Sequence, residues 1–188
     1  MPDSLAQTVS RQNWLDRPAE RLQAAATRAF ERMGPRAEPT YRALHGTRLG
    51  HPLHVMLTDI PIGAWTAAVA FDGLSRLQPG RDWDRAARGA LAVGLTGALG
   101  AVVTGLTDWS RLDAAPRRIG LAHAGLNLLS ALAMTTSLMR RRRPGHGRRS
   151  ALAGYALMLA AARLGGSLVY EHGIGATARE AVPPSQVA

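Results

Sequence analysis

Histidine and carboxylate side chains recur at the borders of the apolar stretches of this sequence. His51 and His54 are three residues apart, so on a helix they share a face, and His123 and Asp108 border two other apolar stretches. Two imidazoles that face one another can ligate a b-type haem. We therefore expect His54 and His123 to be the axial ligands of haem b. We expect His51 to lie beside them, and Asp108 to accept a hydrogen bond from an imidazole N–H.

The same four residues also fit two other chemistries. Imidazole with carboxylate is a ligand set for a transition metal such as zinc, iron or copper, so His51, His54, His123 and Asp108 are equally candidate metal ligands. They could instead form a polar network that holds helix ends together, or line a quinone or substrate pocket. A His-x-x-His pair alone does not decide between these alternatives, because a histidine at a helix start often only caps it.

Four apolar stretches have to position these residues. They run from Leu53 to Leu74, from Gly89 to Thr107, from Ile119 to Met139 and from Ser150 to Tyr170. About 20 apolar residues match the roughly 30 Å hydrocarbon core of a bilayer. The sequence therefore predicts an all-α integral membrane protein. A soluble bundle of Ala-rich helices is the alternative.

The connections between these stretches are short, which forces successive helices to run antiparallel. The expected fold is an antiparallel four-helix bundle in the membrane. In that topology the start of the first span, the end of the second, the start of the third and the end of the fourth share one membrane face. His51, His54, Asp108 and His123 then converge there, and Gly105 and Gly165 leave room between helices. The flat, Ala-rich surfaces also permit a homo-oligomer.

Asp59 and Arg163 lie inside the predicted spans at about one third of the membrane depth. Intramembrane charges are costly and normally find a partner, so we expect Asp59 and Arg163 to form a structural ion pair. The alternative is that Arg163 extends to one membrane surface. The inner halves of the spans carry no other charge, which makes a small transporter or channel the least favoured function.

The composition narrows the partners. The chain has 188 residues, no Cys and a net charge of +10, and all 23 of its basic residues are Arg. The absence of Cys excludes disulfides and thiolate metal sites. Arginines beside membrane spans set topology and contact anionic lipid, so we expect the lipid bilayer, and no nucleic acid, as a partner. The Ala-, Gly- and Arg-rich composition is typical of bacteria, which predicts a multi-pass protein of the bacterial inner (cytoplasmic) membrane.

The N-terminal part differs from the rest. Residues 19–33 place Leu22, Ala26, Phe30 and Met33 on one side, which predicts an amphipathic helix. It could pack on the bundle or on a neighbouring chain, or lie on anionic headgroups. We therefore divide the chain into an N-terminal amphipathic helical extension (1–45), a four-helix transmembrane domain (46–175) and a flexible C-terminal tail (176–188).

Four segments of the chain resemble a known family. They are LHGTRLGHPLHVMLTDIPIGAWT (Leu44 to Thr66), GLTDW (Gly105 to Trp109), LAHAGLN (Leu121 to Asn127) and LGGSLVYEHGIG (Leu164 to Gly175). They resemble the bacterial membrane domain catalogued as domain of unknown function 2231. The resemblance implies a four-helix membrane domain. Some members carry a Rieske iron-sulfur domain after it, which implies a redox setting and a Rieske-type or other redox protein as partner. This chain has Ser167 where many relatives have His.

Two functions remain open at this point. The first is a redox-associated membrane module that binds haem or a metal through the His/Asp cluster. The second is a non-catalytic membrane anchor or docking scaffold in which the same cluster is a structural hydrogen-bond network. The sequence contains no Ser-His-acid arrangement and no Gly-rich phosphate loop after a strand. A cofactor-binding or scaffold domain is therefore favoured over an enzyme.

Overall fold

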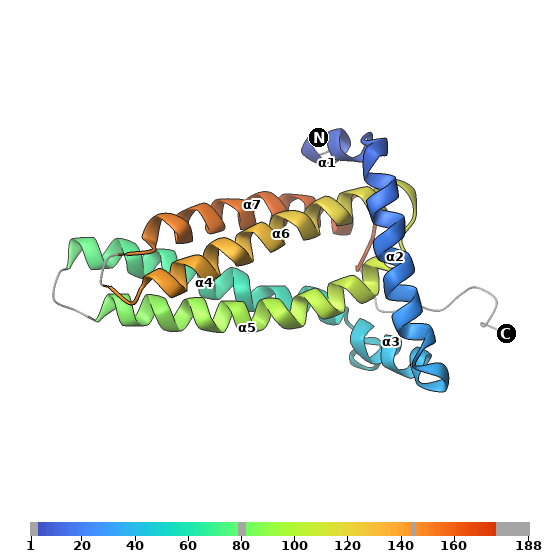
Figure 1. The fold of residues 1–188 in the computed structure, drawn as a ribbon, viewed down its shortest axis with the longest axis horizontal. Coiled ribbons are helices and arrows are strands. Elements are labelled where there is room, and N and C mark those ends of the chain that lie inside the picture. Colours follow the sequence, from blue (N-terminus) through green and yellow to red (C-terminus); the bar gives the residue numbers. More distant parts are fainter. Residues whose placement is uncertain (1–3, 79–81, 144–145, 176–188) are drawn as a thin grey trace. The chain divides into compact units, whose positions relative to one another are not determined.

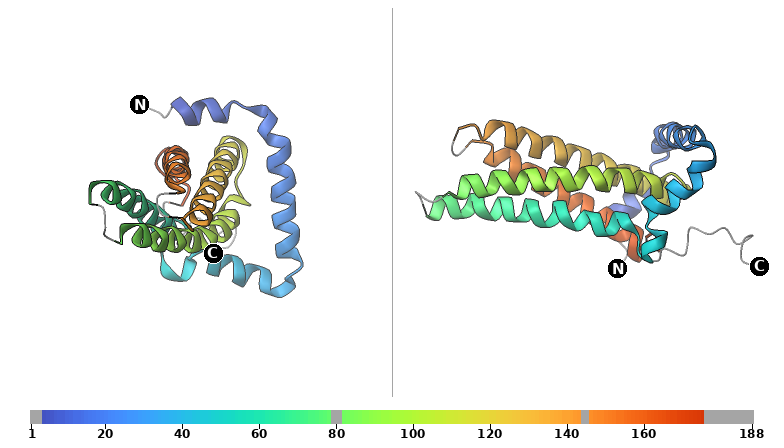
Figure 2. Two further views of the ribbon diagram at one scale, coloured as in Figure 1. Left: turned by 60° about the vertical axis from the view of Figure 1, so that its left-hand side comes forward. Right: turned by 90° about the horizontal axis from the view of Figure 1, so that it is seen from below.

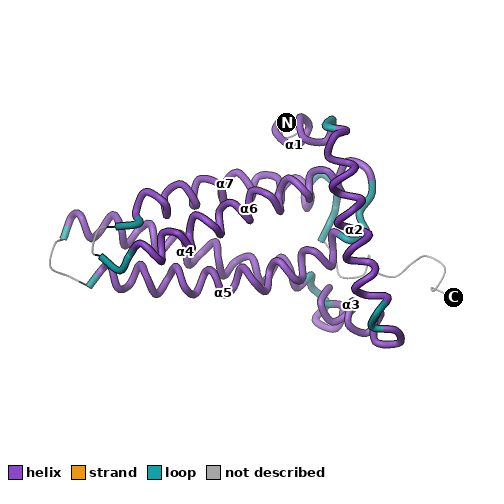
Figure 3. Tube along the Cα trace, viewed as in Figure 1, coloured by secondary structure: helices purple, strands orange, loops and turns teal. Residues whose placement is uncertain are grey.

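The computed structural model describes residues 4–78, 82–143 and 146–175 (Figures 1 and 3). Within these residues the secondary structure is helical throughout, with no strand, and the all-α prediction is confirmed. The α-helices are α1 (Ser4–Ser10), α2 (Asp16–Glu31), α3 (Ala37–His45), α4 (Leu53–Leu77), α5 (Trp83–Trp109), α6 (Ala114–Arg140) and α7 (Arg148–Tyr170). Short 3-10 helices are η1 (Asn13–Leu15), η2 (Gly34–Arg36) and η3 (Thr47–Leu49).

Helices α4 to α7 are the candidate membrane spans. They contain 23 to 27 residues, with a mean hydropathy of 1.3 to 1.8 in their most apolar windows, so they are long and apolar enough to cross a bilayer. The shortest, α7, is about 35 Å long at 1.5 Å per residue, which exceeds a hydrocarbon core of about 30 Å. Each helix contains the apolar stretch that predicts it and extends beyond that stretch into flanking polar residues.

Contacts along the chain divide it into two compact units. Unit 1 comprises Met1–Met56, Ala101–His123 and Arg163–Ala188, and unit 2 comprises Leu57–Gly100 and Ala124–Ala162. Each of the four long helices contributes one part to each unit. The extension up to residue 45 packs in one unit with the ends of the spans, and the domain division drawn from the sequence stays a prediction. The predicted tail, residues 176–188, lies outside the described residues.

Unit 2 consists of four helical segments that lie side by side (Figure 2). Its core cluster contains Trp65, Ala68, Leu91, Met134, Ala151 and Met158. Small residues allow the helices to approach. A Cβ at Gly94 would overlap the Trp65 indole, and the Ser130 hydroxyl donates a hydrogen bond of 2.7 Å to the Gly154 carbonyl. The core is therefore formed by small residues opposite large ones.

Unit 1 contains the N-terminal extension. Within it, α2 begins three residues before the predicted amphipathic helix and ends two residues before its predicted end. Asp16 extends the start, because a carboxylate in the first turn is favourable at a helix N-terminus. Ala19 and Ala26, two turns apart, are buried. The face of α2 that is buried is thus lined by small side chains, which allow the helix to pack closely within the unit.

Candidate functional site

A short, buried polar contact of unit 1 joins α3 to α5. His45, the last residue of α3, donates a hydrogen bond of 2.6 Å from Nδ1 to Oδ1 of Asp108, and their side chains are only 9% and 13% exposed. Gly46 follows with a φ of 87°, and a Cβ there would overlap backbone atoms of His51 and Leu53. Only glycine adopts this conformation without cost, so Gly46 turns the chain into α4 and leaves His45 beside Asp108.

An aromatic ring covers the His45 imidazole. The Tyr41 ring stacks on it, with ring centres 5.9 Å apart and planes inclined by 14°. The Arg111 guanidinium lies 3.3 Å above the Tyr41 ring centre. Burial raises the pKa of Tyr41, so its hydroxyl stays protonated. Nε2 of His45 is buried and has no hydrogen-bond partner among the described residues.

His54, at the start of α4, occupies a fixed position in unit 1. Its Nδ1 lies 2.9 Å from the carbonyl oxygen of Ala101, and since a carbonyl only accepts, Nδ1 is the donor. Nε2 is then the unprotonated nitrogen of the neutral ring. A Cβ at Gly105 would lie 2.6 Å from Cε1 of this ring. The absence of a side chain at Gly105 is therefore what makes room for the imidazole.

His123, on α6, faces His54. Their ring centres are 6.4 Å apart and their planes are nearly perpendicular, at 84°. Gly165 makes room for His123 in the same way that Gly105 makes room for His54. A Cβ at Gly165 would lie 2.9 Å from Cε1 of His123. The spaces at both glycines, which the sequence suggests as room between helices, are therefore filled by the two imidazoles.

The structure does not gather all the residues singled out from the sequence. His54 and His123 are neighbours, whereas Asp108 bonds to His45, which is absent from the predicted ligand set, and His51 is exposed. In the part of the chain that is described, no group of three or more His, Cys, Asp or Glu is placed to hold a metal ion.

The proposed intramembrane ion pair stays a prediction. Asp59 lies on α4 and belongs to unit 2, whereas Arg163 lies on α7 and belongs to unit 1. Both residues are exposed in their own units.

The sequence does contain a signal for His45. Tyr41 and His45 are four residues apart, so on a helix they share a face. The amphipathic helix predicted from the sequence stops at Met33, however, and does not include them. That is why Asp108 has no assigned partner among the residues upstream of His51.

Arginines at the start of α6 hold the N-terminal extension. Arg118 donates two hydrogen bonds to the Asp16 carboxylate, at 2.7 and 2.6 Å, and a third of 2.7 Å to the carbonyl of Ser10. Arg117 reaches the same carboxylate at 3.2 Å. The hydrogen bonds from Arg118 lower the pKa of Asp16, with a smaller contribution from Arg117. Asp16 therefore links α2 to α6 as a carboxylate.

The link between α5 and α6 also contacts the extension. The amide of Gln23 donates to the carbonyls of Trp109, at 3.2 Å, and Leu112, at 2.7 Å. Arg111 pairs with Glu38 at 3.2 Å, and the pKa of Glu38 is lowered by its hydrogen bonds to Arg42 and then to Arg111. Figure 1 shows α2 running across the ends of α5 and α6, and Figure 2 shows α1, α2 and α3 turning around them. The extension is thus docked on this end of unit 1.

These features define a class, a helical membrane protein with four candidate spans and a polar end that carries a docked extension. Residues 50–178 match the family described as predicted membrane protein (DUF2231), and the chain belongs to that family, as the sequence motifs indicate. No curated protein and no solved structure matches the chain. The match supports a location in a membrane, and the family description assigns no activity.

Proposed function

We propose that this protein is a non-catalytic anchor and docking module of the bacterial cytoplasmic membrane. Four helices fix it in the bilayer, and α1 to α3 form a surface at its polar end to which another protein binds. The observation that carries the proposal is the buried hydrogen bond between His45 and Asp108, at 2.6 Å. In this hydrogen bond the Asp108 carboxylate holds α3. Asp108 is also the acidic residue of the candidate ligand set, so that residue already has a structural contact.

Other contacts support the same role. Arg118 and Arg111 reach α2 and α3 from the α5–α6 side, and Gln23 of α2 donates in the opposite direction to the Leu112 carbonyl. Surface ion pairs contribute little each, but several in one unit can fix the orientation of a segment. The other face of α2 exposes arginines, which favours an acidic partner surface: Arg17, Arg21 and Arg28. The family resemblance favours a redox protein, of Rieske type or another, as that partner.

Thermal unfolding of the purified protein in detergent tests the proposal. His45→Ala removes a buried hydrogen-bond partner, and we expect it to lower Tm by several degrees. His51→Ala is the matched control, since His51 is exposed, and should leave Tm unchanged. Adding haem or zinc should not raise Tm. A rise in Tm with one equivalent of either, abolished by His54→Ala, would show that the cluster binds a cofactor instead.

A redox-associated role is the second candidate, and the His54–His123 pair favours it. Metal–nitrogen bonds are about 2 Å long, so imidazoles on opposite sides of one metal ion have ring centres about 6 Å apart. The observed separation is 6.4 Å, and the hydrogen bond to Ala101 leaves Nε2 of His54 as the ligand nitrogen. In this role His54 and His123 would hold haem b, which would supply one-electron chemistry, or a transition metal ion.

An absorption spectrum separates the two candidates. If His54 and His123 ligate haem, protein expressed with added haem precursor should show a Soret band in a one-to-one ratio. The band should disappear in His54→Ala and in His123→Ala but persist in His45→Ala. A colourless preparation without stoichiometric metal would contradict cofactor binding and favour the anchor function.

A further inference from the structure

We propose a binding site for the headgroup of an anionic phospholipid at the polar end of unit 2, remote in sequence from the His/Asp cluster. The site is a cavity of about 220 Å³ between α4 and α7. Three arginines and a carboxylate line its polar part, and apolar or small residues line the remainder. The lining residues are Val69, Asp72, Gly73, Arg76, Arg148, Arg149 and Leu152.

The carboxylate in this cavity is already neutralised. Asp72 accepts two hydrogen bonds from the Arg141 guanidinium, at 2.7 and 2.5 Å, and both side chains are almost fully buried. Such a bidentate pair offsets the charge of the Asp72 carboxylate, which Nε of Arg148 also approaches, at 3.8 Å. Arg141 does not itself line the cavity. The cavity wall therefore has an excess of positive charge.

Two arginines of the cavity have unused donors. Arg76 and Arg149 are exposed, and neither forms an ion pair with any residue that the structure describes. Arg148 donates to Asp84 at 3.0 Å and its Nε lies 3.8 Å from Oδ1 of Asp72, so its charge is already paired. Guanidinium groups bind phosphate oxygens through paired hydrogen bonds. The site thus offers the guanidinium donors of Arg76 and Arg149 to a phosphate.

The position of the cavity matches the headgroup layer. Arg76 is the penultimate residue of α4, and Arg148 and Arg149 are the first two residues of α7. Helix α4 is about 38 Å long, so its last turn extends past a hydrocarbon core of about 30 Å. Trp83 stacks on Phe71 at the same end of unit 2, with ring centres 5.8 Å apart, and tryptophan is enriched at the membrane interface.

The apolar part of the lining favours a lipid over a free anion. Leu152 is exposed, and the space at Gly73 is open, since a Cβ there would meet no atom within 4 Å. Val69 lies one turn deeper along α4 than Gly73. A phosphate held by the arginines would place its first acyl carbons along Val69 and Leu152. Basic pockets between membrane helices are known to bind anionic lipid headgroups.

Lipid-dependent thermal unfolding and native mass spectrometry in detergent test this site. The probe is phosphatidylglycerol, compared with phosphatidylcholine of the same acyl chains and with inorganic phosphate. We expect saturable stabilisation and one retained lipid with phosphatidylglycerol only. The double variant Arg76→Gln, Arg149→Gln should weaken that binding by about tenfold or more. Arg142→Gln with Arg143→Gln is the matched control, because these exposed arginines do not line the cavity.

Three results would overturn the site. Equal stabilisation by phosphatidylcholine would remove the role of charge, and equal loss in the control pair would indicate general attraction to basic loops. Equal protection by inorganic phosphate would assign the cavity to a free anion. If the double arginine variant does not fold, Gly73→Leu replaces it in the experiment, because this substitution fills the cavity and keeps every charge. It should abolish lipid retention, whereas Gly63→Leu, also in open space on α4, should not.

Discussion

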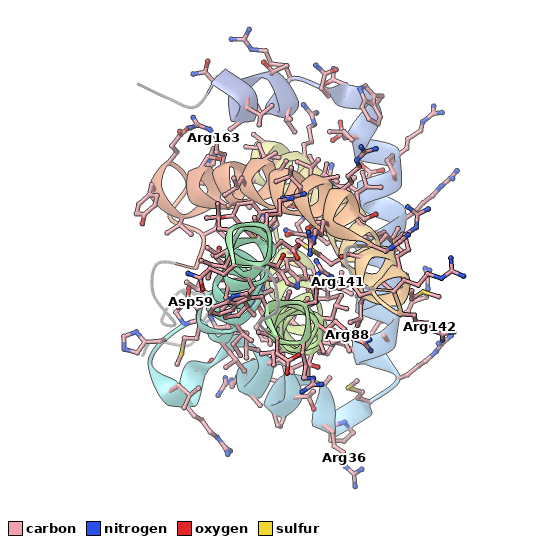
Figure 4. All side chains as sticks on the ribbon, turned by 90° about the vertical axis from the view of Figure 1, so that its left-hand side faces the viewer. Arg36, Asp59, Arg88, Arg141, Arg142 and Arg163 are labelled. Atoms are coloured by element: carbon pink, nitrogen blue, oxygen red, sulfur yellow. The ribbon has the colours of Figure 1, made fainter. Side chains whose placement is uncertain are left out.

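Asp72 on α4 forms a buried, bidentate ion pair with Arg141, the residue just after α6, in unit 2. Arg88 adds a hydrogen bond of 3.1 Å to the carbonyl of Arg141. Figure 4 shows Arg141 between the helices, whereas Arg142 points away from them. One arginine of the Arg140 to Arg143 run is thus a structural residue of unit 2, and the run as a whole does not serve topology alone.

Replacing Arg141 should be far more destructive than replacing its neighbour. Arg141→Ala leaves a buried carboxylate without a counter-charge, and breaking such a pair costs about 3–5 kcal/mol. Arg142→Ala should change the free energy of unfolding by about 0.5 kcal/mol or less. Denaturant unfolding in detergent micelles measures both. Similar effects of the two substitutions would show that the Asp72–Arg141 pair does not stabilise the unit.

The space at Gly105, which the His54 imidazole occupies, should not accommodate a larger side chain. Gly105→Ala places a Cβ 2.6 Å from the imidazole, so the ring or the helix has to move, and we expect a loss of about 1–3 kcal/mol. Gly125→Ala is the control, because a Cβ there meets no atom within 4 Å and alanine favours the helix. Thermal unfolding compares the two. Equal Tm values for Gly105→Ala and Gly125→Ala would show that the His54 imidazole does not need the space at Gly105.

The contact between α2 and α6 should weaken in acid. The folded-state pKa of Asp16 lies below its unfolded value, so its stabilising contribution is complete above the unfolded pKa, about 3.9, and is lost as pH falls through the folded pKa. Spin labels at Ala29→Cys and Val103→Cys can report the distance between α2 and α5 because the chain has no natural Cys. We expect that distance to increase only below about pH 4.

Asp16→Asn provides the control for this pH dependence. It should show the larger or broader distance distribution at neutral pH, and acid should change it little further. An unaltered distance in the parent protein down to strongly acidic pH would mean that Asp16 does not hold α2.

The pairing of Asp59 with Arg163 can be tested by a double-mutant cycle. If the two side chains pair in the membrane, Arg163→Ala should destabilise the protein more than Arg163→Ala combined with Asp59→Ala. The difference reflects an unpaired charge inside the bilayer, which we expect to amount to about 1 kcal/mol or more. Equal costs for the single and double variants would leave Arg163 as a residue that extends to the membrane surface.

The sequence predicts the spans well because they depend on a local property. About twenty consecutive apolar residues predict a membrane-spanning helix whatever their neighbours are, so the four spans follow from hydropathy. The helix borders do not, since α5 begins six residues before the apolar stretch that predicts it. The antiparallel order also follows, since the links are short. Family membership follows from motifs that are themselves local.

The partners of individual side chains could not be predicted in the same way. Asp108 has several imidazoles within reach in any antiparallel arrangement, and the selection of His45 depends on the left-handed turn at Gly46 and on the short helix α3. Likewise, nothing in the run of four arginines distinguishes Arg141 from Arg142. Their roles differ only because the helix rotation at the end of α6 points one of them inward.

The most direct test of the docking function is amide hydrogen exchange of the protein in lipid nanodiscs. Asp108→Ala removes the carboxylate that fastens His45, and losing a charge-assisted hydrogen bond should raise exchange in residues 37–45 by about tenfold or more. Helices α5 to α7 should remain protected, and Asp113→Ala, an exposed carboxylate in the α5–α6 link, should change nothing. Unchanged exchange of α3 in Asp108→Ala would contradict the proposal that this cluster holds the extension in place.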